Sequence, residues 1–315
     1  MRKILLTGWT GFIGAELLKQ LKLKKYFIHT SSRSVLESKI DKVKHFRINQ
    51  IDNNLNWSEA LEGVDCIIHC AGITSEANKT DINDFRKINV EETHNLAYQA
   101  ATKGVKRLIF LSSIKVNGER TEEFSSFKNT DIPNPVGIYA MSKWESEKSL
   151  HTISKKTGLE IVIIRAPMVY GQGVKGNFLR LLNLVDRDFP LPFGKVNNLR
   201  SFVSLDNLVD LIIHCINHPK AAGKTFLVSD GEDLSTPSLV KSIANIMKKN
   251  SYLIPVPISL INFTSKIIGK SKEIDRLIYS LQIDNSFTIK TLDWKPITTV
   301  EEGLFKTIQW YLKKK

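Results

Sequence analysis

The sequence predicts an α/β protein, a doubly wound (Rossmann) parallel sheet with a smaller C-terminal substrate-binding α/β domain. Short, almost wholly apolar runs alternate with amphipathic stretches through residues 1–165, and a glycine-rich turn follows the first run. Apolar runs without strict alternation are typical of parallel strands covered on both faces, and strands that alternate with helices indicate βαβ units. After residue 165 the alternation of apolar and amphipathic segments gives way to closely spaced glycines and prolines, which predicts a second, smaller domain.

The predicted elements follow one another along the chain. Six apolar runs are expected to be strands of one sheet, at residues 3–7, 26–30, 44–48, 66–70, 107–111 and 160–165. Helical periodicity is clearest over residues 12–23 and 89–103. One more strand is expected at 225–229, before a helical C-terminal third. In such sheets the ligand crevice lies outside the carboxyl ends of the strands, so the chemistry is expected there.

Composition excludes several classes of protein. The 315 residues are 42% hydrophobic, too apolar for a disordered chain, and no run of 18 apolar residues predicts a membrane span. The N-terminus does not read as a secretory signal. Three scattered cysteines indicate buried thiols in a reducing cytoplasm, without metal-ligand spacing. The formal net charge of +13 comes from scattered lysines, so no nucleic-acid partner is expected. For the apolar stretch 253–269 one alternative is contact with a membrane surface, but its polar face holds few cations, so we expect it to pack inside the C-terminal domain.

A glycine-rich turn joins the first strand to the first helix. Gly8 permits the tight turn, Gly11 lets the backbone approach a pyrophosphate, and Gly14 allows close packing of helix on strand. The free amide groups at the helix N-terminus would then face the phosphates. We therefore predict dinucleotide binding by the turn residues Gly8, Thr10, Gly11, Phe12, Ile13 and Gly14.

The end of the second strand should distinguish NAD from NADP, because an acid there hydrogen-bonds the ribose 2′-hydroxyl. This chain has no acid at that point and reads Thr-Ser-Ser-Arg-Ser over residues 30–34. Arg33 would pair with a 2′-phosphate through its planar guanidinium, with Ser32 as an additional donor. NADP(H) is therefore the favoured cofactor, and NAD(H) is the alternative.

A serine pair, a tyrosine and a lysine form the candidate proton-transfer set. Ser112 and Ser113 close the fifth predicted strand, and Tyr139 precedes Lys143 by four residues in a stretch of helical character. This spacing puts the phenol and the ammonium on one helix face. An ammonium beside a phenol favours the phenolate, which suits general acid–base catalysis.

Three segments together resemble a known family: residues 7–14, residues 65–72 and the Tyr139-x-x-x-Lys143 pair. They resemble extended short-chain dehydrogenases/reductases of the NAD-dependent epimerase/dehydratase family. Within it, the chain is similar to the nucleotide-sugar branch that contains UDP-hexose 4-epimerases and UDP-4-keto-6-deoxyhexosamine 4-reductases. The resemblance and the change in composition after residue 165 together predict two domains. Residues 1–168 would form an NADP(H)-binding Rossmann domain, to which residues 200–230 would return, and residues 169–315 would mainly form a nucleotide-sugar-binding domain.

The resemblance implies a role for each candidate site residue. Tyr139 is the acid/base, Lys143 binds the nicotinamide ribose and tunes Tyr139, and Ser113 hydrogen-bonds the sugar C4 oxygen. Asn89 supports Lys143, and Arg200 pairs with the pyrophosphate of a UDP-sugar substrate. Further cofactor contacts are expected from Gln50, Ile51, Cys70, Ala71, Gly72, Asn89, Ser112 and Pro167, and further substrate contacts from Lys115 and Asn177.

One departure from the family pattern narrows the reaction. Sugar-nucleotide 4,6-dehydratases place Asp-Glu directly after the catalytic Thr or Ser, whereas this chain has Ile114 and Lys115, so dehydration is not expected. We predict an NADPH-dependent 4-ketoreductase of a UDP-4-keto-6-deoxy-N-acetylhexosamine in the synthesis of a bacterial surface polysaccharide (O-antigen or capsule). The alternatives are a UDP-hexose or UDP-N-acetylhexosamine 4-epimerase with retained NAD, and a non-catalytic NADP(H)-sensing regulator.

Two more expectations come from the family. The Arg-x-Gly-Asp segment that epimerases often carry near the C-terminus is not evident between Tyr279 and Trp294, and Arg276 is considered in its place as the second phosphate contact. A homodimer is expected through the helix at 89–103 and the helix that begins near Tyr139.

Overall fold

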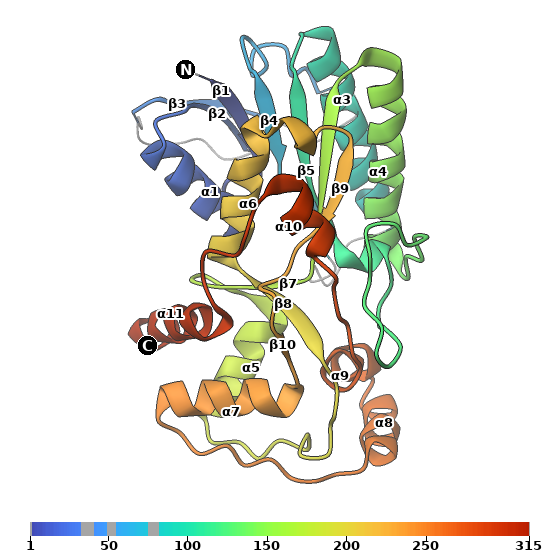
Figure 1. Ribbon diagram of the computed structural model, residues 1–315, viewed down its shortest axis with the longest axis vertical. Helices are drawn as coiled ribbons and strands as arrows, with labels where there is room; N and C mark the ends of the chain where they lie inside the picture. Colours follow the sequence, from blue (N-terminus) through green and yellow to red (C-terminus); the bar gives the residue numbers. More distant parts are fainter. Residues whose placement is uncertain (1, 33–40, 49–54, 75–81, 315) are drawn as a thin grey trace.

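The computed structural model describes residues 2–32, 41–48, 55–74 and 82–314 (Figure 1). Its main layer is a seven-stranded sheet of order β3-β2-β1-β4-β5-β6-β9, in which each neighbouring pair is parallel. The order reverses between β1 and β4, which places the expected ligand crevice there. The strands are β1 (Lys3–Thr7), β2 (Phe27–Ser32), β3 (Val43–Arg47), β4 (Cys66–His69), β5 (Arg107–Ser113), β6 (Glu160–Ala166) and β9 (Lys224–Leu227).

Helices cover both faces of this sheet, α1 and α6 on one side and α3 and α4 on the other (Figure 1). Ile4 and Leu6 of β1 pack with α1 and α6, whereas Leu5 between them packs with α3 and α4. Both faces are therefore apolar, which is why the strands read as unbroken apolar runs. The predicted doubly wound α/β fold is confirmed. The helices around this sheet are α1 (Phe12–Leu23), α2 (Ile82–Phe85), α3 (Glu92–Thr102), α4 (Ile138–Thr157), α6 (Leu205–Asn217) and α10 (Ser286–Leu292).

The helix expected over 89–103 has a different beginning in the structure. A π-helical segment, η1 (Arg86–Glu91), precedes α3 and continues directly into it. Wide π-turns commonly occur at functional sites. Here the segment carries the buried side chain of Asn89, so the irregular turn sets the position of a candidate site residue.

A smaller lobe continues from the carboxyl edge of the large sheet (Figure 1). Its three-stranded sheet has the order β10-β8-β7, and α5, α7 and α11 contribute to its separate apolar core. The elements of this lobe are β7 (Met168–Tyr170), α5 (Gly176–Asp186), β8 (Arg200–Ser204), β10 (Asp233–Leu234), α7 (Thr236–Met247), α8 (Ile258–Ile267), α9 (Ser271–Ile278) and α11 (Val300–Lys313).

The expectation that residues 253–269 pack inside this lobe is wrong for most of α8. Only Ile261 and Ser265 of that helix are buried, while its other large apolar side chains face outward. None of the helices in the described part of the chain is long and apolar enough to cross a membrane.

The carboxylate of Asp230 joins the two lobes just after β9. It accepts hydrogen bonds from the Ser204 amide (2.8 Å), the Asn207 side-chain amide (2.6 Å) and the Tyr170 hydroxyl (2.7 Å). These donors belong to the end of β8, to α6 and to β7. Because hydrogen bonds to a largely buried carboxylate are strong, Asp230 holds the smaller lobe at a fixed position against the large sheet.

Candidate active site

The turn between β1 and α1 has the geometry of a phosphate cradle. Gly8 has φ of +72°, and a Cβ there would lie 2.6 Å from the Ala71 amide nitrogen. A Cβ on Gly14 would collide with the Gly8 carbonyl. Gly11 is the N-cap of α1, which has no side-chain cap and no acid in its first turn. Amide donors and the positive end of the helix dipole are thus left for an anion, as a dinucleotide requires.

Lys143 lies inside the carboxyl edge of the sheet. Its ammonium donates to the Leu111 carbonyl (2.9 Å) and lies 4.5 Å from the centre of the Phe110 ring. Only 6% of the residue is exposed, and burial lowers the pKa of the ammonium to about 8. A Cβ on Gly72 would lie 3.6 Å from Nζ. The ammonium therefore lies close to the backbone that follows β4, near the point where the strand order reverses and where the crevice is expected.

Asn89 connects the region around Lys143 to α4 through hydrogen bonds. Its side chain accepts from the Ile73 amide (2.8 Å) and donates to the Ile73 carbonyl (3.1 Å) and to the Ser142 hydroxyl (2.9 Å). Ser142 in turn donates to the Tyr139 carbonyl (2.8 Å). The structure thus places Asn89 against the residue that directly precedes Lys143 in α4, as a positioning group for this helix.

His69 belongs to a buried hydrogen-bond chain and not to the acid–base chemistry. Thr93 donates to the Asn89 carbonyl (2.6 Å), so its hydroxyl accepts from His69 Nε2 (2.9 Å). On the other side, His69 Nδ1 accepts from the Thr7 hydroxyl (2.7 Å), which itself accepts from the Ala71 amide. Burial lowers the pKa of His69 to about 3. A neutral imidazole therefore connects the end of β1 to the π-helical turn.

The ion pair between Glu147 and Arg165 is the main feature that the sequence did not reveal. Arg165 donates to both carboxylate oxygens (3.1 and 2.6 Å), and Ser112 donates to the same carboxylate (2.5 Å). Glu147 is fully buried and Arg165 is 4% exposed. Ser112, predicted as a cofactor contact, thus points toward α4. The sequence did hold one signal for Glu147: it follows Lys143 by four residues, as Lys143 follows Tyr139, so all three lie on one face of the helix.

Ser113 and Tyr139 lie at the mouth of the same region. Ser113 is the last residue of β5 and caps the short helix η2 (Ile114–Val116), where its hydroxyl accepts from the Lys115 amide (3.3 Å). Tyr139 is in the first turn of α4 and is half-buried. The predicted set is therefore carried by β5 and α4, which are packed against each other.

Three cations gather on the side of the smaller lobe. Burial and the charges of Arg276 and Arg200 lower the pKa of Lys115, which pairs with Glu119 (2.7 Å). Burial, and next the charge of Arg276, lower the pKa of Arg200 to about 10. Arg200 also donates to the Tyr279 carbonyl (2.8 Å). This group of Lys115, Arg200 and Arg276, with one adjacent acid, suits a diphosphate.

Other predicted site residues have more limited support. Asn177 is the second residue of α5 and accepts a hydrogen bond from Arg180 (3.3 Å). Ser32 lies 3.3 Å from His45 Nε2 at the end of β2. Burial raises the pKa of the Cys70 thiol to about 12, so it is an inert wall residue. Thr10 lies in the turn after β1, Phe12 and Ile13 begin α1, and Pro167 lies between β6 and β7. Arg33, Gln50 and Ile51 lie outside the described residues.

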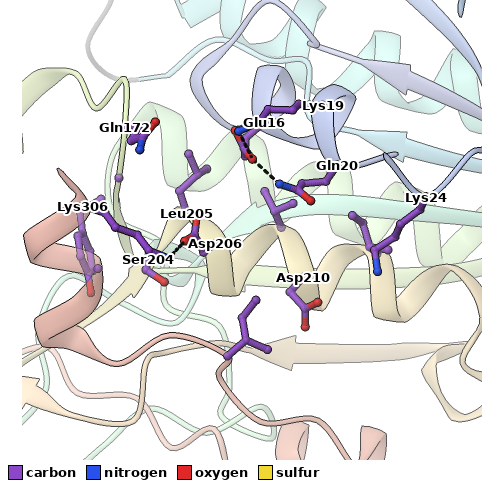
Figure 2. Close-up of a pocket in the computed structure, with 16 residues that line it drawn as sticks. Glu16, Lys19, Gln20, Lys24, Gln172, Ser204, Leu205, Asp206, Asp210 and Lys306 are labelled. Carbon is purple, nitrogen blue, oxygen red and sulfur yellow. Dashed lines mark hydrogen bonds and ion pairs between the residues drawn. The ribbon is translucent and has the colours of Figure 1, made fainter. Parts of the chain in front are cut away.

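A separate hollow of about 310 Å³ lies among α1, α6 and α11 (Figure 2). Its lining includes Glu16 and Lys19 of α1, Asp206 and Asp210 of α6, and Lys306 of α11. Lys306 pairs with Asp206 (2.6 Å), and none of the predicted site residues lines this hollow. It is therefore distinct from the crevice at the carboxyl ends of the strands.

The fold is that of the dinucleotide-binding α/β enzymes, and Ser113, Tyr139 and Lys143 are its candidate reactive residues. Residues 4–229 match the NAD dependent epimerase/dehydratase family, and the chain belongs to that family. It is 43% identical to a UDP-glucose 4-epimerase of Vibrio cholerae, over 99% of this chain and 96% of the relative. The predicted membership of the nucleotide-sugar branch is confirmed.

More distant relatives share the whole fold. An Escherichia coli O157:H7 N-acetyl-α-D-glucosaminyl-diphospho-ditrans,octacis-undecaprenol 4-epimerase is 24% identical over 98% of this chain and 94% of its own. The Thermotoga maritima UDP-glucose 4-epimerase structure with UDP-glucose superposes with a TM-score of 0.77 at 21% identity, covering 99% of each chain. The Bacillus cereus UDP-glucuronic acid 4-epimerase structure with NAD gives 0.78 at 21% identity, over 98% and 96%.

The substitution Glu147→Gln tests the buried ion pair. The neutral amide would leave the Arg165 guanidinium buried without a counter-charge, so we expect the free energy of unfolding to fall by about 3–5 kcal/mol. Glu145→Gln is the matched control on the same helix, because Glu145 contacts Arg86 only at 3.9 Å near the surface and should cost less than about 1 kcal/mol. Urea denaturation followed by circular dichroism measures both values, and equal losses would contradict the assignment.

Proposed function

We propose that this protein is a UDP-sugar 4-epimerase that retains NAD. The observation that carries the proposal is the set Ser113, Tyr139 and Lys143 at the junction of β5 and α4, close to the phosphate cradle. The 43% identity to the Vibrio cholerae UDP-glucose 4-epimerase over nearly the whole chain supports epimerisation over the 4-ketoreductase that the sequence first favoured.

The chain's own residues fit a dinucleotide. The turn from Gly8 to Gly14 would hold the pyrophosphate, and Lys143 would bind the nicotinamide ribose beside Gly72. When bound, the nicotinamide would supply an acceptor and a donor of hydride for sugar C4. Because hydride would be returned to the same substrate molecule, an epimerase needs no net supply of reduced cofactor.

Tyr139 would move the proton of this reaction. Its phenolate takes the proton of the C4 hydroxyl as C4 is oxidised, and its phenol returns the proton when C4 is reduced on the other face. The Ser113 hydroxyl donates a hydrogen bond to the C4 oxygen and keeps it aligned with the phenol. The Lys143 ammonium, held by the Leu111 carbonyl, stabilises the negative charge of the phenolate in a site of low dielectric.

The cation group of Lys115, Arg200 and Arg276 would hold the diphosphate of the substrate. Arg200 is 8% exposed, and a largely desolvated guanidinium binds phosphate oxygens strongly and with a defined direction. The diphosphate would thus be anchored on the smaller lobe while the sugar reaches toward Ser113. This arrangement leaves the sugar ring as the part of the substrate that turns over between the two half-reactions.

The 4-ketoreductase is the second candidate, and one feature of the chain favours it. The second strand ends at Ser32, and the sequence continues with Arg33 and has no acid there for a ribose 2′-hydroxyl. This sequence pattern suits NADPH as a consumed reductant. Both candidates use the same proton-transfer residues, so cofactor identity and net consumption separate them. A regulator that binds the dinucleotide without turnover is the third candidate.

A homodimer through α3 and α4 is also part of the proposal. These helices pack side by side on one face of the large sheet (Figure 1). Their outer side presents Tyr98, which is 55% exposed and stacks on His94 (ring centroids 6.5 Å apart), and Met141, which is 44% exposed. Apolar and aromatic side chains of this kind are enriched at subunit contacts.

The reaction is tested with the purified protein and no added cofactor. We expect acid denaturation to release NAD, and UDP-glucose to be converted to its C4 epimer, as followed by chromatography. Tyr139→Phe removes the acid–base hydroxyl and should lower kcat about a thousandfold while the variant still releases NAD. Stoichiometric NADPH consumption with a UDP-4-keto-6-deoxy sugar, and no epimerisation, would instead establish the reductase.

The pH dependence tests Lys143. A pKa of about 8 means that the ammonium is charged below this pH and loses its proton as the pH rises through it, so kcat/KM should fall above about pH 8. Lys143→Arg keeps its charge throughout this range, and its alkaline limb should move upward although its maximal rate is lower. The same limb in both proteins would assign it to another group.

The cation group is tested by neutral substitutions. Arg276→Gln and Lys115→Gln should each raise KM for UDP-sugar about tenfold or more, with a smaller change in kcat, because a charge-assisted contact to phosphate is lost. Arg187→Gln, which changes an exposed arginine at the end of α5, should leave both constants unchanged. An unchanged KM in the first two variants would place the diphosphate elsewhere.

A further inference from the structure

The helix α8 presents a continuous apolar stripe to solvent. Leu260, Phe263 and Ile267 are 50%, 62% and 71% exposed, and their spacing of three and four residues puts them on one face. Ile261 and Ser265 are the buried residues of this helix and form its inner side. The stripe is therefore the outward side of a helix that already packs on the lobe through its inner side.

Other segments at the outer end of the smaller lobe, the end farthest from the large sheet, also expose large apolar side chains (Figure 1). The connection from α7 runs along this end (Figure 1) and exposes Tyr252 (53%) and Ile254 (47%), and Ile268 just after α8 is 65% exposed. Large side chains grouped in this way on a monomer surface indicate a contact with a partner or a membrane.

The charge of this surface shows which kind of partner fits. Residues 234–272 contain six lysines and no acid, and Lys266 and Lys270 flank the stripe directly. Glu273 and Asp275 of α9 are the next acids along the chain, and Lys249 is neutralised by Asp188 (2.8 Å). The helix α8 itself carries one lysine, Lys266, and no acid, and Lys270 follows just after it. An exposed apolar helix face with lysines beside it and no acid on the helix suits the interface of an anionic bilayer.

We propose that α8 docks this protein on the surface of a membrane containing anionic lipid, with Leu260, Phe263 and Ile267 inserted among the acyl chains and Lys266 and Lys270 at the headgroups. A second copy of this chain fits less well, because two such faces would bring like charges together. The proposal is independent of the reaction. Since α9, which carries Arg276, packs on α8, docking would place Arg276 on the helix next to the one that contacts the lipid.

Vesicle flotation of the whole protein tests the docking. Vesicles of phosphatidylcholine with phosphatidylglycerol should carry the protein to the top of the gradient, and vesicles of phosphatidylcholine alone should carry much less. Raising the salt concentration should weaken the binding, because the lysine contribution is screened. Equal binding to both vesicle types, or none to either, would overturn the proposal.

Matched variants assign the binding to this face. Phe263→Ser/Ile267→Ser should reduce the fraction bound to anionic vesicles about tenfold or more, while the melting temperature stays close to that of the parent. Leu23→Ser/Phe305→Ser removes similarly exposed side chains (68% and 54%) from α1 and α11 and should leave binding unchanged. Unchanged binding in the α8 variant, or a change from dimer to monomer caused by it in sedimentation velocity, would contradict the assignment; the latter would make the face a subunit contact.

Discussion

The buried ion pair between Glu147 and Arg165 is the contact on which the candidate site depends. It fixes α4 against β6, and through Ser112 it also holds the end of β5. Any arrangement that separates the two side chains would leave a buried charge without its partner, at a large cost in free energy. The pair therefore favours one arrangement of α4 against the strands. Tyr139 and Lys143 are carried on this helix, so in the proposed reaction the geometry of proton transfer would depend on a contact that itself takes no part in the chemistry.

A second set of contacts adjusts the same helix from the other side. The π-helical turn η1 brings Asn89 to the Ile73 backbone and to Ser142, and the neutral His69 connects this turn to β1. The cofactor cradle and the catalytic helix are thus joined by a chain of buried hydrogen bonds. Such networks rigidify a site because each unsatisfied member would carry a large desolvation cost.

The smaller lobe contributes charge where the large sheet contributes reactive groups. Lys115 extends from the end of β5, whereas Arg200 and Arg276 come from β8 and α9, so the cation group forms only when the lobe is held by Asp230 and its donors. The outward apolar face of α8 lies on the same lobe. The proposed anchoring of the substrate and the surface contact proposed for α8 would therefore depend on the same lobe.

Much of the fold could be predicted from the sequence alone, and so could the candidate residues of the proposed reaction. Apolar runs, the glycine turn and the Tyr139–Lys143 spacing are local patterns, and strand and helix periodicity together with backbone sterics determine what they form. The sequence did not predict the π-helical turn, the Glu147–Arg165 pair or the exposed face of α8. These features depend on which distant elements pack together. Packing determines which side chains are buried and which hydrogen-bond partners they find, and therefore what their desolvation costs in free energy.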